Sequence, residues 1–436
     1  MLDRPRGGER AVLVNVALAP PASGCDVEEF AELAASAGVD CVATMAARRD
    51  RPDPKHFLGT GKAEELKALV ADSEAEVVLF DRTLSPAQER NLERLVCCRV
   101  LDRTGLILDI FAQRARSFEG QLQVEMAQLK HLSTRLVRGW SHLERQRGGI
   151  GLRGPGETQL ETDRRLIGIR IKQLHDRLDK VRRQRQQGGR ARRRASLSVT
   201  ALVGYTNAGK STLFNALTSS DIYAADQLFA TLDTTLRRMN VPGEHPVLLS
   251  DTVGFIRDLP PDLVAAFQGT LEETRDATLL LHVIDCCAED IEVKRDEVLS
   301  VLERVGAGEQ PILEVYNKID LNPAFEPRID RGAGGEPVAV WVSARTGAGL
   351  DLLRAAVAAR LDETKQVRQL VLAPREGRLR AQLYAMGAVL EESIGEEGEW
   401  ILEANLSIER WGRLFAEHPA LAPADYAHGS DADEWD

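Results

Sequence analysis

Features that would place this chain in a membrane or outside the cell are missing or scarce in its sequence. No run of about 18 apolar residues occurs, so no segment is long enough to cross a bilayer as a helix. The start, MLDRPRGGER, is polar and lacks the apolar core of a signal peptide. The six cysteines include the adjacent pairs Cys97–Cys98 and Cys286–Cys287, whose spacing is not that of zinc or redox motifs. We therefore expect a cytoplasmic protein with reduced thiols and no membrane span.

Basic residues are outnumbered by acidic ones over the chain as a whole, 56 against 67, which gives a formal net charge of −11. Residues 135–194 are the exception, with 18 Lys and Arg against 6 Asp and Glu, so this segment carries +12 and the remainder −23. A basic segment inside an acidic protein predicts contact with nucleic acid, without distinguishing DNA from RNA. The alternative is a solvated helix face with salt bridges, which fits the mixed-charge centre better than the arginine- and glycine-rich ends.

The 436 residues are too many for one ordinary core, since a domain averages about 150 residues. Residues 1–102 predict an N-terminal α/β domain, because apolar runs such as AVLVNVAL and AEVVLF alternate with stretches of helical spacing. Repeated strand–helix units imply a parallel sheet. Within this region GTGK, residues 59–62, predicts a turn and helix cap, with an anion site as the alternative.

Residues 103–195 predict an antiparallel helical hairpin. Two long stretches with apolar residues at three-and-four spacing flank the glycine-rich segment RGGIGLRGPGETQ, residues 147–159, which we expect at the tip. QQGGRARRR, residues 186–194, has the composition of a basic linker to the next domain.

A glycine-rich loop begins the next region, residues 196–364, which resumes the strand–helix alternation. GYTNAGKS, residues 204–211, matches G-x-x-x-x-G-K-[ST] between an apolar run and a helical stretch. Its glycines allow backbone N–H groups to surround phosphates at a helix N-terminus. Lys210 is expected to reach the outer phosphates and Ser211 to bind Mg²⁺. The pattern predicts a P-loop nucleotide hydrolase domain.

Three shorter motifs follow in order at predicted strand ends. In DTVG, Asp251 can hold Mg²⁺ through a water, and the Gly254 N–H can sense a γ-phosphate. In NKID, Asp320 can accept the N1–H and 2-amino protons of guanine, which adenine lacks. In SAR, residues 343–345, the backbone can meet the base oxygen. Together they predict a GTPase of the translation-factor-like class, with the nucleotide at the carboxyl ends of the strands.

The segment DQLFATLDTTLRR, residues 226–238, predicts a first switch. A threonine here can complete the Mg²⁺ shell only when a γ-phosphate is present, which gives an order–disorder switch. We favour Thr231 for this role, although Thr234 and Thr235 also fit the spacing.

The residue that follows DTVG is Phe255. In many GTPases a glutamine at this point orients the attacking water. A phenylalanine cannot do so, and we expect unaided hydrolysis to be slow and a partner or another residue to assist.

These motifs together resemble those of the HflX GTPases. The resemblance rests on GYTNAGKST, LFATLD, DTVGFIRDLP, ATLLLHVID, NKID, GGIGLRGPGETQLETDRR and KHFLGTGKAEEL, and covers about residues 11–364. It implies a ribosome-associated GTPase that binds the large ribosomal subunit and its RNA through residues 135–194 and dissociates stalled or idle ribosomes under stress. It also implies that the tip of the hairpin reaches toward the peptidyl-transferase region.

The resemblance implies GTP and Mg²⁺ as ligands, with Mg²⁺ on Ser211 and Thr231. Lys210, Thr231 and Gly254 are expected to serve catalysis. The expected GTP contacts are Gly204, Tyr205, Thr206, Asn207, Ala208, Gly209, Lys210, Ser211, Thr212, Phe229, Ala230, Thr231, Leu232, Asp233, Asp251, Thr252, Val253, Gly254, Asn317, Lys318, Ile319, Asp320, Ser343, Ala344 and Arg345. The family often has proline after FATLD, where this chain has Thr234, and this change loosens the backbone of the first switch.

Residues 365–427 predict a small C-terminal α+β domain of strand, helix, strand and helix, and residues 428–436 a disordered tail. The fold class expected for the chain is thus multidomain α/β, and we expect a monomer. Two other functions stay open from the residues alone: a GTP-dependent ribosome assembly factor and an RNA-remodelling ATPase.

Overall fold

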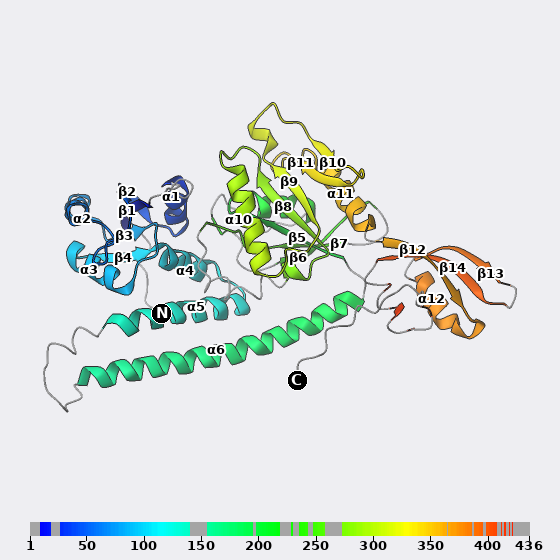
Figure 1. Cartoon of the computed structure of the whole chain (residues 1–436), viewed down its shortest axis with the longest axis horizontal. Helices are drawn as coiled ribbons and strands as arrows, with labels where there is room; N and C mark the ends of the chain where they lie inside the picture. Colours follow the sequence, from blue (N-terminus) through cyan, green and yellow to red (C-terminus); the bar gives the residue numbers. More distant parts are fainter. Residues whose placement is uncertain are drawn as a thin grey trace. The chain divides into compact units, whose positions relative to one another are not determined.

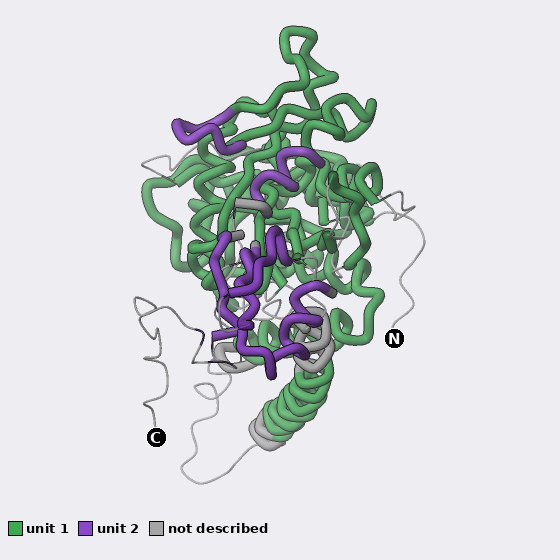
Figure 2. The backbone as a smooth tube through the Cα atoms, turned by 90° about the vertical axis from the view of Figure 1, so that its right-hand side faces the viewer, with its two compact units in different colours: residues 1–330, 338–353 green, residues 331–337, 354–436 purple. Residues whose placement is uncertain are grey.

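A computed structural model describes most of the chain. The described residues are 9–18, 27–139, 155–194, 198–218, 228–229, 235–242, 247–257, 273–363, 365–385, 388–395, 398–407 and single positions up to 421. The predicted hairpin tip before 155, the predicted tail 428–436 and residues 230–234 of the first switch lie outside these ranges. The chain forms two compact units, residues 1–330 with 338–353, and residues 331–337 with 354–436 (Figure 2).

The N-terminal part is a four-stranded parallel sheet in the order β2-β1-β3-β4, as the alternating pattern predicts. The valine- and leucine-rich central strands β1 and β3 bury both faces, as parallel strands covered by helices do. A capping box starts one helix, since the Ser85 hydroxyl accepts from the Gln88 N–H while the Gln88 side chain accepts from the Ser85 N–H. The elements are β1 (Arg10–Leu18), α1 (Val27–Ser36), β2 (Asp40–Arg49), α2 (Thr60–Ser73), β3 (Val77–Phe80), α3 (Pro86–Val96) and β4 (Arg99–Asp102).

The helical region begins directly at the end of that sheet. Its helices are α4 (Arg103–Arg114), α5 (Phe118–Gly139) and α6 (Pro155–Arg194). The first predicted long helix is therefore two helices, because the Ser117 hydroxyl caps a new one by accepting the Gly120 N–H at 2.9 Å. Helices α5 and α6 pack through Leu122, Met126, Leu174 and Leu178. Helix α6 is continuous through residues 186–194, where the composition indicated a linker, and it includes residues 155–159 of the expected tip (Figure 1).

The following domain contains a seven-stranded sheet in the order β10-β11-β9-β8-β5-β7-β6. Only β6 is known to run antiparallel to its neighbour, whereas β7, β5, β8, β9 and β11 pair in parallel. The strands are β5 (Ser198–Gly204), β6 (Thr235–Met239), β7 (Val247–Asp251), β8 (Leu279–Asp285), β9 (Ile312–Asn317), β10 (Arg328–Arg331) and β11 (Pro337–Trp341). The described helices are α7 (Lys210–Thr218), α10 (Ile291–Arg304), η2 (Ile319–Leu321) and α11 (Leu350–Glu363).

The second compact unit carries a three-stranded antiparallel sheet in the order β12-β14-β13. Its core includes Leu372, Leu402 and Trp411, and the Trp411 indole N–H donates to the Gln366 carbonyl at 2.7 Å. The helix expected between the two strands ends at Ala385, and residues from Val389 pair with β14 as a further strand that was not expected. The elements are β12 (Lys365–Leu372), η3 (Pro374–Glu376), α12 (Gly377–Ala385), β13 (Val389–Ile394) and β14 (Trp400–Ser407).

The predicted multidomain α/β class is confirmed. None of the helices in the described ranges is long and apolar enough to cross a membrane.

Candidate functional site

The sequence motifs meet at one edge of the seven-stranded sheet. Strands β5, β7, β9 and β11 run in parallel, with β8 between β5 and β9, and end at or just before the four motifs, at Gly204, Asp251, Asn317 and Trp341. Because the carboxyl ends of parallel strands lie at the same edge, the four motif segments form one site.

The phosphate loop spans residues 204–209, between β5 and α7. Its backbone needs unusual dihedrals, since φ is +61° at Asn207 and +89° at Gly209. A Cβ at Gly209 would collide with the amide nitrogen of Asn317, so this position requires glycine. The loop leads into the N-terminus of α7, where backbone N–H groups and the helix dipole favour an anion.

Lys210 is buried at the start of α7. Its Nζ donates to the carbonyls of Gly204 at 3.0 Å and Tyr205 at 2.7 Å. Burial lowers the pKa of Lys210 to about 8, and the Asp251 carboxylate opposes part of this shift. In this arrangement two of the three ammonium protons are bonded to the loop's own carbonyls, which leaves the third for a phosphate.

Ser211 and Asp251 lie side by side. The Ser211 hydroxyl donates to Asp251 Oδ2 at 2.9 Å, which joins the first turn of α7 to the end of β7. A hydroxyl and a carboxylate together are hard oxygen donors of the kind Mg²⁺ prefers beside phosphate oxygens, so these residues fit the ion. The part of the chain that the structure describes contains no group of three His, Cys, Asp or Glu side chains that could hold a metal alone.

The second switch, defined here as residues 251–257, packs on the phosphate loop. Thr206 N–H donates to the Phe255 carbonyl at 2.7 Å, and Phe255 N–H donates to the Gly204 carbonyl at 3.1 Å. Gly254 lies so close that a Cβ there would be 3.0 Å from Lys210 Nζ. The Phe255 side chain is buried and carries no polar group that could orient an attacking water.

The loops on the opposite side of the site are already joined by hydrogen bonds. The Asn317 amide donates to the Ala208 carbonyl at 2.9 Å and accepts the Ala344 N–H at 2.9 Å. The Ser343 hydroxyl donates to Asp320 Oδ1 at 2.6 Å, which holds the carboxylate expected to read guanine. The structure thus brings NKID, SAR and the phosphate loop together.

Some predicted residues cannot be placed and some contacts were missed. Residues 230–233 of the predicted GTP contacts, including Thr231, lie outside the described ranges, whereas Phe229 is described and buried. Sequence reasoning missed Asp285, which pairs with Lys318 at 2.8 Å. Its position at the end of a strand next to β9 was the available signal. The site assignments themselves stay predictions.

Comparisons with known proteins agree with this geometry. Family models described as GTP-binding GTPase N-terminal, GTP-binding GTPase Middle Region and 50S ribosome-binding GTPase match residues 25–112, 114–193 and 199–318.

Among curated proteins, the chain is 55% identical to GTPase HflX of Escherichia coli K12 over 421 residues, which covers 97% of this chain and 99% of the relative. It is 43% identical to GTPase HflX of Caldanaerobacter subterraneus subsp. tengcongensis over 398 residues, covering 91% of each. A solved GTP-binding protein from Sulfolobus solfataricus in complex with GDP is 23% identical, with a TM-score of 0.43 over 81% of this chain and 99% of that one. On the identity with these curated relatives, the chain belongs to the HflX family of GTPases and hydrolyses GTP.

Proposed function

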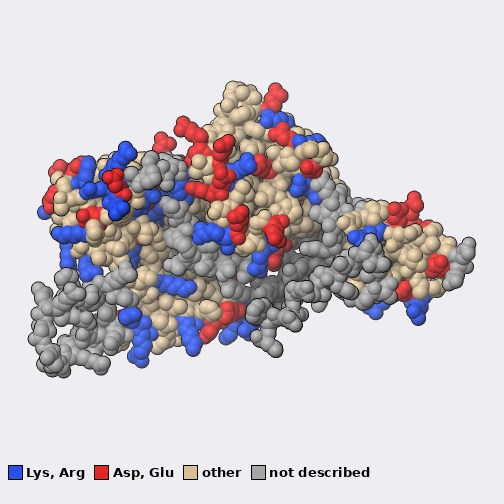
Figure 3. Space-filling view, in the orientation of Figure 1, with Lys and Arg blue, Asp and Glu red and all other residues tan. Residues whose placement is uncertain are grey.

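We propose that this GTPase binds the large ribosomal subunit in a manner set by its bound nucleotide, and that it dissociates stalled or idle ribosomes. The observation that carries the proposal is the long basic helix next to the GTPase domain. On the face shown in Figure 3, Lys and Arg side chains line the described part of α6, while Asp and Glu gather over the GTPase domain. Arg164, Arg165 and Arg177 on α6 are exposed, as contact with RNA phosphates requires. The match to a family model described as 50S ribosome-binding GTPase supports the same partner.

The nucleotide is held from both ends of the site in this proposal. Asp320 accepts the two guanine donors, and Ser343 keeps that carboxylate in place. Loop N–H groups and the Lys210 ammonium bind the phosphates, and Ser211, Thr231 and Asp251 would hold Mg²⁺. The ion would neutralise negative charge on the phosphates during hydrolysis.

Hydrolysis by the isolated chain is proposed to be slow. The buried Phe255 offers no polar group to the attacking water, and its backbone is hydrogen-bonded to the phosphate loop. The ribosome would then supply or reposition the missing group, so that hydrolysis follows docking.

The proposal is tested by light scattering of intact ribosomes mixed with the protein. With a non-hydrolysable GTP analogue the scattering should fall as subunits separate, and with GDP it should not. The double variant Arg164→Glu/Arg165→Glu should need several-fold more protein. A matched reversal of exposed arginines in the second compact unit, Arg375→Glu/Arg378→Glu, should change little. Binding to large subunits without any separation of intact ribosomes would refute dissociation and favour an assembly factor.

A further inference from the structure

A closed ring of hydrogen bonds joins the nucleotide site to the N-terminal domain. The Tyr205 hydroxyl, in the phosphate loop, donates to Glu29 of α1. The same hydroxyl oxygen accepts the backbone N–H of Arg257, in the second switch, at 2.9 Å. Arg103, at the start of α4, donates to Glu29 and also to the Arg257 carbonyl, the latter at 3.2 Å. The ring therefore closes through the four residues Glu29, Tyr205, Arg257 and Arg103.

The members of this ring are shielded from water. The side chains of Arg103 and Glu29 are only 8% and 9% exposed, and Tyr205 is 7% exposed. Burial and the neighbouring Glu29 carboxylate raise the pKa of Tyr205, which keeps its hydroxyl protonated and able to donate. Removing one partner would leave a buried polar group unpaired, so the ring should act as a unit.

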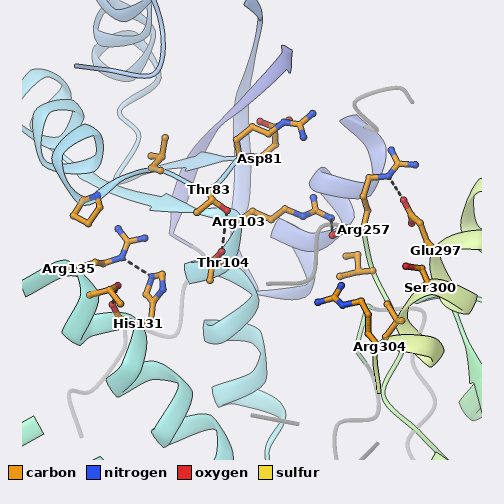
Figure 4. A pocket seen from close by; sticks show the side chains of 16 residues that line it. Asp81, Thr83, Arg103, Thr104, His131, Arg135, Arg257, Glu297, Ser300 and Arg304 are labelled. Atoms are coloured by element: carbon orange, nitrogen blue, oxygen red, sulfur yellow. Dashed lines mark hydrogen bonds and ion pairs between the residues drawn. The ribbon is translucent and has the colours of Figure 1, made fainter. Parts of the chain in front are cut away.

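A cavity of about 780 Å³ borders the ring (Figure 4). Its lining includes Arg103 and Thr104 from α4 and Arg257, Glu297 and Arg304 from the GTPase domain. The Arg257 side chain extends to Glu297 at 2.9 Å.

The first switch contacts the same two helices, α1 and α4. The Leu228 N–H donates to the Ser36 hydroxyl at the end of α1, at 3.0 Å. The Phe229 ring packs edge-on against Phe111 of α4, with centroids 4.7 Å apart. Both switch segments are thus attached to helices α1 and α4, within one compact unit.

We propose that Tyr205 is a positioning residue whose hydroxyl holds the second switch close against the phosphate loop. A Cβ at Gly254 would be 3.0 Å from Lys210 Nζ, so a γ-phosphate bound to this lysine would displace Gly254. Gly254 lies three residues before Arg257, so that displacement would pull on the backbone that Tyr205 holds. Binding of a γ-phosphate and closure of the ring therefore oppose each other, and the N-terminal domain responds to the nucleotide through Glu29. GDP has no γ-phosphate, so its binding does not require the second switch to move. This inference rests on GTP as the nucleotide and is independent of the ribosome.

The test compares affinities of the purified full-length chain for GDP and for a non-hydrolysable GTP analogue, both with Mg²⁺ and without ribosomes. Tyr205→Phe should tighten binding of the analogue relative to GDP by about fivefold or more, the usual scale of coupling between sites. Glu29→Gln should act in the same direction. The double variant should exceed neither single change by much, because both break one ring. The matched control is Tyr384→Phe, which also removes a tyrosine–glutamate hydrogen bond, here to Glu392 at 2.5 Å, in the other compact unit.

An unchanged ratio between the two nucleotides in Tyr205→Phe would overturn the proposal. Equal loss of affinity for both would also overturn it, because it would show a merely structural role. Since no ribosome is present, either result leaves the proposed ribosomal function untouched, and failure of that function leaves this test unaffected.

Discussion

The base side and the phosphate side of the nucleotide site differ in how their polar groups are satisfied before any ligand binds. On the base side, Asn317 and Ser343 already make the bonds that hold the two loops together and leave Asp320 in position. On the phosphate side, Lys210 bonds to loop carbonyls, and Ser211 bonds to Asp251. The base side is preorganised by hydrogen bonds between its loops, whereas the phosphate loop is hydrogen-bonded to the second switch. This difference suggests that base identity is read by a fixed surface and that phosphate binding is the step coupled to movement.

The largest expected effect on nucleotide affinity comes from a substitution on the base side of the site. Asp320→Asn should reverse the pairing pattern and move preference from guanosine to xanthosine triphosphate, changing the ratio of the two affinities on the order of 10⁴-fold. Competition binding with both nucleotides measures it. Asp330→Asn, which alters a carboxylate bonded to Trp341, serves as the control. Unchanged use of GTP by Asp320→Asn would refute the assignment of the base contact.

Loss of the buried Lys210 ammonium should have the next largest effect on nucleotide affinity. Lys210→Ala removes charge-assisted bonds to phosphate and should weaken GTP binding by about 100-fold. Equilibrium binding with a fluorescent GTP analogue measures it, and Lys62→Ala, at an exposed i,i+3 pair with Glu65, is the control. Retention of full affinity would show that the loop amides bind the phosphates alone.

The lowered pKa of Lys210 gives a pH dependence of binding. Below pH 8 Lys210 is already protonated. Above pH 8 it is mostly neutral and must take up a proton when it binds the phosphates, so the affinity for GTP should fall as the pH rises. From pH 7 to pH 9 the loss should be about tenfold for one such group. Calorimetry in buffers of different ionisation enthalpy measures the proton uptake. Lys210→Arg stays charged throughout and should remove this pH dependence; equal slopes for both proteins would assign the uptake elsewhere.

The smallest expected effect comes from removing the hydrogen bond that holds Asp320 on the base side. Ser343→Ala removes the 2.6 Å bond to Asp320 but leaves the carboxylate, so GTP affinity should fall by only about fivefold, the scale of one hydrogen bond. The loss should be similar for GDP and GTP, because both carry guanine. A loss restricted to GTP would contradict the separation of the two sides.

The sequence predicted those strands and helices whose pattern of apolar and polar residues lies within one short segment. Strands ending at Gly204, Asp251 and Asn317 follow from apolar runs bounded by polar motifs, and their meeting follows from a parallel sheet. The break between α4 and α5 depends on a single serine cap, and the continuation of α6 through a glycine-containing basic stretch depends on context that propensity does not capture.

The ring around Tyr205 could not be predicted, because nothing in the local pattern links Glu29 to a loop 176 residues away. Tertiary contacts between domains leave no periodic trace in the sequence. The role of Phe255 could be judged from the sequence, because a phenylalanine side chain has no polar group that could orient a water.

The central claim is that the ribosome completes a GTPase site that the isolated chain leaves incomplete. Its most direct test is the rate of GTP hydrolysis with and without purified large ribosomal subunits, over a series of salt concentrations. We predict strong stimulation that declines as salt rises, because basic residues of the hairpin contact phosphates. Tight GTP binding with no stimulation at any salt concentration would contradict the claim, and the ribosome would no longer be the catalytic partner.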